Sequence, residues 1–494
     1  MTLKVLSVAS EAVPLIKTGG LADVAGALPS ALAPHGAGVT TLLPGYPAVM
    51  AKAVSGPGKL RTVHRWDALL GKPARLLAGK LGEHPLLVLD APGYFARDGG
   101  PYGDAQGADR PDNGQRFAAF GRAAADVAGG AVKGPGNKQV RFDLLHAHDW
   151  QAAMAVAYLR YAPFAAARRV PTVMTIHNMA FQGWFAADLF ERLELPRAAW
   201  SIEGVESYGG VGFLKAGLQL ADMITTVSPS YAAEIRSPEF GMGLDGLIVS
   251  RGDRVRGVVN GIDTAEWDPA NDPALAAQFT ARTLGKRAAN KRALEAEFGL
   301  DPEEGPLFIV ITRLTWQKGM DVLPEVLDHL VGNGARLALL GSGDAMLEAA
   351  LRAGAARHPG KIGIRIGYDE ALSHRMQAGG DAILVPSRFE PCGLTQLYGL
   401  RYGCVPVVSR TGGLADTVID ANPAALAAGV ATGVQFSGVN YHGLAAAIGR
   451  AVALYRQPEV WRRIQRNGLA SDVSWSRSGA DYAAIYRELV DEAS

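Results

Sequence analysis

The chain has little cysteine, no long apolar run and almost no net charge. Only Cys392 and Cys404 occur in 494 residues, and their spacing is not that of a metal-binding pair. No stretch reaches the roughly 18 apolar residues that a transmembrane helix needs. The 49 basic and 48 acidic residues nearly cancel, so the basic excess typical of nucleic-acid binding is missing. With no signal-peptide pattern at the start, these absences predict a reduced, cytoplasmic protein that binds neither a membrane nor nucleic acid.

What the chain does contain is an alternation of short apolar runs and helical patterns, which predicts an α/β fold with parallel sheets. Its length is too great for one core, so we expect two lobes, residues 1–248 and 249–474. The predicted strands of the first lobe are 4–10, 38–43, 85–89, 142–146, 171–176 and 223–227. Those of the second lobe are 255–259, 307–312, 336–340, 362–366, 382–385, 405–409 and 433–436. A Gly-, Asp- and Pro-rich stretch, 94–122, is expected to be a surface loop, either at the rim of a cleft or as a plain excursion.

One strand-to-helix loop places a carboxylate beside a helix start. Glu390 follows the apolar run 382–385, and Cys392, Gly393, Leu394 and Thr395 lead into a helical pattern. The first amides of a helix lack internal partners and attract phosphate, while a carboxylate accepts hydrogen bonds from hydroxyl groups. The stretch therefore fits a sugar nucleotide, and an ordinary loop glutamate is an equally good explanation of this stretch alone.

Two further loops suggest anion binding. Lys17 precedes Gly19 and Gly20 at a predicted helix start, although a plain glycine-rich turn is the commoner meaning of such a loop. Arg313 and Lys318 follow the strand 307–312, and two cations in one such loop can converge on a diphosphate. The alternative is a pair of solvated charges that bind nothing. This alternative is less favoured because the loops of Lys318 and Glu390 both lie at carboxyl ends of strands in one lobe, where they can meet.

Polar side chains also end two strands of the first lobe, namely His146 to Trp150 and the pair His177–Asn178. Such positions bind ligands in α/β sheets. His146 and His148 lie on one face of a strand, but no third metal ligand is evident. We therefore expect structural or substrate-contact roles for them, and no metal site.

The six residues Thr-Gly-Gly-Leu-Ala-Asp occur twice, as 18–23 and as 411–416. Each copy follows a strand pattern and precedes a helical one. The repeat favours two similarly built lobes, each turning a Gly-Gly helix start toward a shared cleft.

Taken together, five motifs resemble the bacterial glycogen synthases and plant starch synthases, in the same order and over nearly the whole chain. They are Lys17-Thr-Gly-Gly-Leu, His177-Asn178, Asn260-Gly-Ile-Asp, Arg313 with Lys318, and Glu390-Pro-Cys-Gly-Leu-Thr-Gln. The resemblance implies a GT-B fold, in which two Rossmann-like lobes flank the active site. It also implies that residues 475–494 form a helix that returns to the first lobe.

The resemblance also assigns residues. It implies that Lys17 contacts ADP-glucose, that Arg313 and Lys318 hold its diphosphate, and that Glu390 binds the glucose hydroxyls. Four further positions match those around the donor: Asp23, His177, Asn260 and Tyr368. The implied reaction is retaining transfer of glucose from ADP-glucose to the non-reducing 4-hydroxyl of an α-1,4-glucan, without a cofactor.

Two positions depart from the pattern. Tyr398 stands where many retaining GT-B enzymes have a second glutamate that grips the ribose, which leaves the ribose contact open. After His177, Met179 and Phe181 replace the more frequent Leu and Tyr with similar bulk.

Two other functions fit the sequence less well. A dehydrogenase would carry a dinucleotide fingerprint, but the stretch 341–346 lacks the third glycine, and an absorbance assay for nicotinamide turnover would decide. A non-catalytic glucan- or sugar-nucleotide-binding protein is disfavoured by the full set of charged residues. The residues do not choose between ADP- and UDP-glucose.

Overall fold

The computed structural model describes residues 2–55, 60–132, 141–161 and 169–493. The chain divides into two compact units, which are described separately. The first unit comprises Met1–Asn260 and Trp475–Ser494, and the second comprises Gly261–Ser474. The chain therefore crosses between the units twice.

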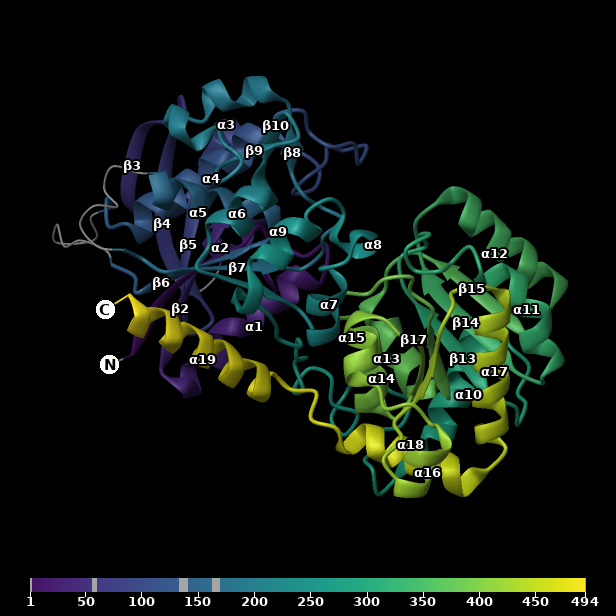
Figure 1. Ribbon diagram of the computed structural model, residues 1–494. Coiled ribbons are helices and arrows are strands. Elements are labelled where there is room, and N and C mark those ends of the chain that lie inside the picture. The colour runs from purple at the N-terminus through teal and green to yellow at the C-terminus, as the bar shows by residue number, and fades with distance from the viewer. Residues whose placement is uncertain (1, 56–59, 133–140, 162–168, 494) are drawn as a thin grey trace. The chain divides into compact units, whose positions relative to one another are not determined.

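The first unit is built on a nine-stranded sheet in the order β12-β11-β7-β6-β1-β2-β5-β4-β3 (Figure 1). All neighbours are parallel except β4, which runs antiparallel to both β3 and β5. Its strands are β1 (Leu3–Val8), β2 (Ala37–Pro44), β3 (Arg61–Leu69), β4 (Lys72–Leu81), β5 (His84–Asp90), β6 (Leu144–His148), β7 (Thr172–Ile176), β11 (Met223–Thr226) and β12 (Val255–Gly257). A separate small sheet joins β8 (Trp184–Phe185), β10 (Gly210–Gly212) and β9 (Glu206–Ser207).

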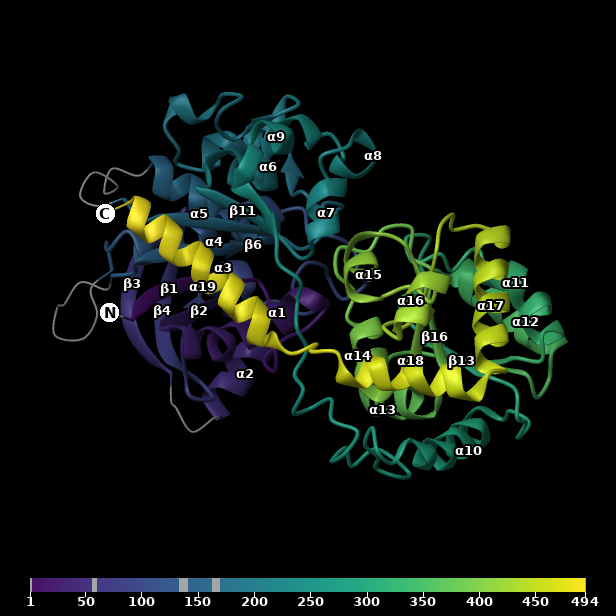
Figure 2. The ribbon, with the colours of Figure 1, turned by 60° about the horizontal axis from the view of Figure 1, so that its bottom comes forward.

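Apolar side chains alternate between the two faces of this sheet, as a strand's period of two requires. On one face, Val5 packs with side chains of the helices α1 (Gly20–Leu32) and α19 (Trp475–Glu492). On the other face, Leu6 belongs to a larger core that includes α4 (Asn113–Ala128), α5 (Asp149–Tyr161) and α6 (Phe213–Leu220). Both views show α19 lying along α1 (Figures 1 and 2). The last helix of the chain thus completes the core of the first unit.

The remaining helices of the first unit are short. They are α2 (Pro47–Ser55), α3 (Pro92–Phe95), α7 (Pro229–Glu234), α8 (Pro238–Gly241) and α9 (Asp245–Ser250), with 3₁₀ turns at Ala33–His35, Ala187–Arg192, Arg197–Ala199 and Gly252–Arg254.

The second unit holds a six-stranded, wholly parallel sheet in the order β15-β14-β13-β16-β17-β18. Its strands are β13 (Leu307–Ile311), β14 (Arg336–Gly341), β15 (Ile362–Ile366), β16 (Ala382–Val385), β17 (Val405–Ser409) and β18 (Val434–Phe436). Its helices are α10 (Arg287–Phe298), α11 (Leu323–Gly332), α12 (Ala345–Arg357), α13 (Glu370–Gly379), α14 (Thr395–Tyr402), α15 (Gly412–Thr417), α16 (Pro423–Ala428), α17 (Tyr441–Tyr455) and α18 (Pro458–Ala470). This strand order reverses between β13 and β16, as in a doubly wound dinucleotide-binding sheet.

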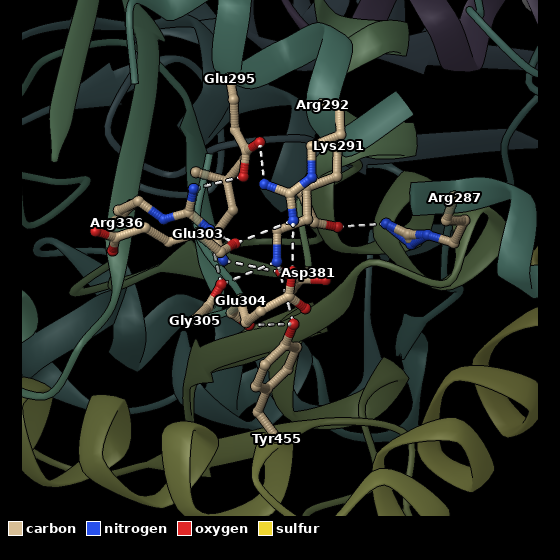
Figure 3. A network of polar contacts seen from close by, with 12 residues as sticks. Arg287, Lys291, Arg292, Glu295, Glu303, Glu304, Gly305, Arg336, Asp381 and Tyr455 are labelled. Carbon is tan, nitrogen blue, oxygen red and sulfur yellow. Dashed lines mark hydrogen bonds and ion pairs between the residues drawn. The ribbon is translucent and has the colours of Figure 1, made fainter. Parts of the chain in front are cut away.

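The amino ends of these strands are tied together by a network of buried charges (Figure 3). Arg336, at the start of β14, forms an ion pair with Glu295 of α10, and both side chains are almost fully buried. Lys291 of the same helix pairs with Asp381, just before β16, at 2.7 Å. Because buried charges need partners, these pairs fix α10 against the sheet.

Two expectations were wrong, and two strands were missed. The run 255–259 does not open the second lobe: β12 pairs in parallel with β11, so the first unit extends to Asn260 and not only to the neighbourhood of residue 248. The stretch 94–122 is not all surface loop, because α4 begins at Asn113 and is buried along most of its length. Strands β3 and β4 were not predicted. They form one side of the sheet, with β3 as the edge strand, and β3 is largely exposed. They therefore lack the continuous apolar run of a buried strand.

Candidate active site

In the second unit, two loops meet where the strand order reverses. The loop after β13 carries Lys318, and the loop after β16 carries Glu390. The amide of Arg388 donates to the carbonyl of Gln317 at 2.8 Å, and the side chain of Gln317 donates to the carbonyl of Phe389 at 3.2 Å. The expected meeting of these loops is confirmed.

The ammonium of Lys318 forms an ion pair with the carboxylate of Glu390. The same carboxylate oxygen accepts a hydrogen bond from the hydroxyl of Ser387 at 2.8 Å. The Lys318 side chain is 15% exposed and that of Glu390 is 9% exposed. The pair is therefore sheltered but still reachable, as groups that bind a ligand must be.

Helix α14 begins next to this pair at Thr395, with no side-chain cap at its start. Gly393 takes a left-handed conformation with φ of +74°, which a residue with a Cβ adopts only at a cost. Gln396 donates to the carbonyls of Cys392 and Gly393 at 3.0 and 2.9 Å. The stretch from Cys392 to Thr395 is thus folded back on itself, and its helix start offers amides to an anion.

The second Gly-Gly turn, Gly412–Gly413, packs against this loop. The amide of Gly413 donates to the carbonyl of Glu390 at 3.1 Å. A Cβ on Gly413 would lie 2.3 Å from the carbonyl oxygen of Cys392, and one on Gly412 would lie 2.0 Å from that of Glu390. Only glycine allows the two backbones to approach so closely.

Two further predicted residues of this unit are exposed to solvent. Arg313 is exposed in the loop after β13, and Tyr368, after β15, is 75% exposed. Tyr398 stacks on Trp267, with ring centroids 3.6 Å apart.

In the first unit, the predicted Lys17 loop leads into α1. The ammonium of Lys17 pairs with the carboxylate of Asp23 at 2.8 Å. Gly19 is the residue before the helix, is extended, and a Cβ there would meet nothing within 4 Å. This helix start therefore has open space in front of it, unlike the Gly-Gly turn of the second unit.

The structure adds two residues that the sequence reasoning missed. Glu11, just beyond β1, accepts hydrogen bonds from the hydroxyls of Thr18, at 2.6 Å, and of Tyr102. Tyr102 comes from the stretch predicted as a surface loop. Glu11 follows the carboxyl end of a central strand, and that position is the signal that could have identified it.

His177 is held at the end of β7 by two buried groups. The carboxylate of Asp149 accepts the backbone amide of His177 at 2.6 Å, and His148 shares a ring-to-ring hydrogen bond with His177 at 3.0 Å. Burial raises the pKa of Asp149 to about 7 and lowers the pKa of His177 to about 3. Asp149 itself has φ of +53°, a strained conformation that places its carboxylate at the amide.

Asn178 and Asn260 complete the predicted set. The side chain of Asn178 accepts the amide of Ala180 at 3.0 Å, which shapes the turn after His177. Asn260 is the last residue of the first unit before the chain crosses to the second, and its buried side-chain oxygen has no protein partner among the described residues.

Comparisons with known proteins agree with this architecture. Residues 4–250 match the family model "Starch synthase catalytic domain", and residues 292–468 match "Glycosyl transferases group 1". The chain is 71% identical over 492 residues to a glycogen synthase of Novosphingobium aromaticivorans, covering all of both chains. It is 58% identical over 490 residues to a glycogen synthase of Mesorhizobium japonicum, covering 99% of each.

Among solved structures, the chain resembles the catalytic domain of starch synthase IV from Arabidopsis thaliana bound to ADP and acarbose. The TM-score is 0.86 with 30% identity, over 99% of this chain and all of that one. Two Rossmann-like sheets with these domain matches define a glycosyltransferase of the GT-B class. Within that class, the chain belongs to the glycogen and starch synthase family.

Two properties of the described residues bear on the sequence predictions. None of the helices in the described ranges has the length and apolar character needed to cross a membrane. In the same ranges, no three His, Cys, Asp or Glu side chains gather as ligands of a metal ion would.

Proposed function

We propose that the protein transfers glucose from ADP-glucose to the non-reducing 4-hydroxyl of an α-1,4-glucan and retains the anomeric configuration. The observation that carries the proposal is the Lys318–Glu390 pair beside the start of α14, at the strand-order reversal of the second sheet. A cation, hydroxyl-binding carboxylate and free helix amides together suit a nucleotide diphosphate that carries a sugar. Family membership supports the same reaction.

The difficult step of such a transfer is departure of the ADP phosphate. As the glycosidic bond breaks, negative charge grows on the diphosphate. Lys318, Arg313 and the amides at the start of α14 would stabilise that charge more strongly in the transition state than in the ground state. Because Lys318 is paired with Glu390 before the donor binds, its ammonium is already oriented and partly sheltered from water.

Glu390 has a different proposed role. Its carboxylate is fixed by Ser387 and Lys318, and it would accept hydrogen bonds from glucose hydroxyls. Such contacts hold the anomeric carbon within reach of the acceptor hydroxyl. We do not assign Glu390 as a nucleophile. Instead we propose a front-face transfer, in which the leaving phosphate takes the proton of the acceptor hydroxyl.

We also assign residues of the first unit to the donor. Lys17, Gly19, Gly20 and Asp23 lie at the start of α1, and His177 and Asn178 follow β7. Lys17 is assigned to the diphosphate and His177 to the sugar. Asn260 and Tyr368 are assigned to the surroundings of the donor.

The test is incubation with glycogen and radiolabelled ADP-glucose, with UDP-glucose in a parallel arm. We expect label to enter the polymer faster from ADP-glucose, and NMR of the new linkage to show the α-anomer. Absence of transfer from both donors would contradict the activity. Faster transfer from UDP-glucose would contradict only the donor assignment, and a β-linked product would contradict retention.

A further inference from the structure

Three buried side chains of the first unit form a line of hydrogen bonds that ends at His177. The hydroxyl of Ser7, on β1, lies 3.2 Å from Nε2 of His148, on β6. Nδ1 of His148 lies 3.0 Å from Nε2 of His177, just after β7. Ser7 and His148 are essentially inaccessible to solvent, and His177 is 9% exposed. Adjacent strands of one parallel sheet therefore bring together residues more than 140 positions apart.

The hydrogen bonds of this line all donate in one direction, which follows from counting the N–H and O–H donors. Burial lowers the pKa of both histidines far below the usual range, so each ring is neutral and carries one N–H. Among the described residues, the only acceptor for the Ser7 hydroxyl is His148. A buried O–H without an acceptor is costly, so Ser7 donates to Nε2 of His148. The proton of His148 then lies on Nδ1 and is donated to Nε2 of His177.

This direction decides which nitrogen of His177 carries its proton. Because Nε2 of His177 accepts from His148, the N–H of His177 is at Nδ1. Within the described part of the chain, Nδ1 of His177 has no hydrogen-bond partner, whereas Nε2 and the backbone amide are both engaged. The ring therefore presents a single N–H donor away from the line.

We propose that His148 is a positioning residue that fixes the ring orientation and the tautomer of His177, so that Nδ1–H of His177 is the donor offered to an oxygen of the sugar nucleotide. The proposal rests on the proposed function only for the identity of the ligand. A neutral donor suits a sugar hydroxyl or a phosphate oxygen, whereas the opposite tautomer would present a lone pair to them.

His146 provides a matched control. Its ring stacks on that of His148, with centroids 4.0 Å apart, and it is equally buried. However, its nitrogens contact Tyr486 of α19 at 2.7 Å and Thr175 at 2.5 Å, so it stands outside the line. Replacing His146 disturbs the same core without removing a bond to His177.

The experiment is ¹⁵N NMR of histidine-labelled protein without substrate, with His177 identified by its loss in His177→Asn. In the wild type, we expect one neutral tautomer at His177 with the proton on Nδ1. In His148→Phe, we expect both tautomers, with kcat for glucosyl transfer reduced about tenfold and KM for ADP-glucose nearly unchanged. His148→Asn, whose amide can still donate toward His177, should recover much of that loss. His146→Phe should keep the wild-type tautomer.

If His148→Phe fails to fold, Ser7→Ala makes the same test by removing the donor at the start of the line. A wild-type His177 protonated at Nε2, or a single Nδ1–H tautomer that persists in both His148→Phe and Ser7→Ala, would overturn the proposal. The NMR result does not depend on turnover. A wild-type protein that transfers no glucose would therefore contradict the proposed function and leave the tautomer assignment standing.

Discussion

Two of the sheltered ion pairs of the second unit lie at opposite ends of one sheet. At the amino ends of the strands, Arg336 and Glu295 are 0% and 1% exposed. The Arg336 guanidinium also donates to the carbonyls of Asp301, Glu303 and Gly305 at 2.5 to 2.8 Å. At the carboxyl ends, Lys318 and Glu390 are more exposed, and the ammonium donates to the carboxylate of Glu390. In the first pair, both terminal nitrogens of Arg336 are engaged by protein oxygens, whereas the Lys318 ammonium of the second pair keeps hydrogen-bonding capacity.

The difference shows how a single kind of interaction serves stability at one end and ligand binding at the other. The guanidinium of Arg336 is buried, and its four terminal N–H groups are taken by Glu295 and three backbone carbonyls, so it cannot bind a ligand. A lysine ammonium has three donors in flexible directions, so Lys318 can hold Glu390 and also approach a phosphate. Ligands of α/β sheets bind at the carboxyl ends of the strands. The pair with spare hydrogen-bonding capacity lies at that end, and the structural pair lies at the amino end.

The largest expected effect is on stability, in Arg336→Met. The change leaves Glu295 in the core with only the half-exposed Arg292 beside it, at 2.7 Å, and breaking a buried pair costs about 3–5 kcal/mol. Urea unfolding should show this loss. Below the unfolding temperature, kcat per folded molecule should stay near that of the wild type. Arg292→Met is the control, because the half-exposed Arg292 can be lost while Glu295 keeps its buried partner Arg336, so we expect a smaller loss of about 1 kcal/mol. An equal loss in both variants would contradict the assignment.

Lys318→Ala should show the reverse. We expect kcat to fall by roughly 10²–10³-fold, as on loss of one donor to a developing anion, with weaker ADP binding and little change in unfolding. Steady-state rates and calorimetric titration with ADP measure the two effects. Lys361→Ala serves as control, since Lys361 pairs with Asp301 and Glu303 at the amino end. Normal turnover in Lys318→Ala would refute the role of the carboxyl-end pair.

Glu390→Ala tests whether the two members of the carboxyl-end pair act differently. Misplacement of the sugar should lower turnover by about 10²-fold, while the diphosphate contacts keep ADP binding nearly normal. The same titrations apply, after a check that the variant is folded. If ADP affinity fell as far as in Lys318→Ala, the assignment of Glu390 to the sugar would be wrong.

Gly413→Ala tests whether close backbone packing stabilises the loop of Glu390 at the carboxyl end of the sheet. Its new Cβ would press on the backbone of Cys392, and such overpacking costs about 1–3 kcal/mol. We expect a lower unfolding midpoint together with reduced turnover. Gly19→Ala changes the first glycine of the repeated motif in the first unit, where a Cβ meets nothing within 4 Å, and it should leave the midpoint unchanged. Similar midpoints for the two variants would show that the close approach is unimportant.

The smallest expected effect is that of EDTA. If Lys318, Arg313 and helix amides neutralise the leaving diphosphate, a divalent ion is not needed for that purpose. Turnover measured with and without the chelator should agree. Loss of activity that magnesium restores would show that the side chains at the carboxyl end are insufficient.

The sequence by itself determined the strands of the second unit. Strands β15, β16 and β17 have the predicted bounds, because a strand covered on both faces is a continuous apolar run between turn residues. It also identified Lys318 and Glu390, since charged groups at the ends of such strands can be read locally. Their roles remain predictions.

Only the tertiary structure decided the features that depend on a distant partner. The run after residue 254 is a strand of the first sheet because β11 is beside it, and no local pattern names that neighbour. Tyr102 reaches Glu11 across 91 positions. The two Thr-Gly-Gly-Leu-Ala-Asp copies have identical side chains, yet Gly19 is extended and Gly412 has φ of +43°. Glycine permits both conformations, so the choice between them came from what each turn packs against.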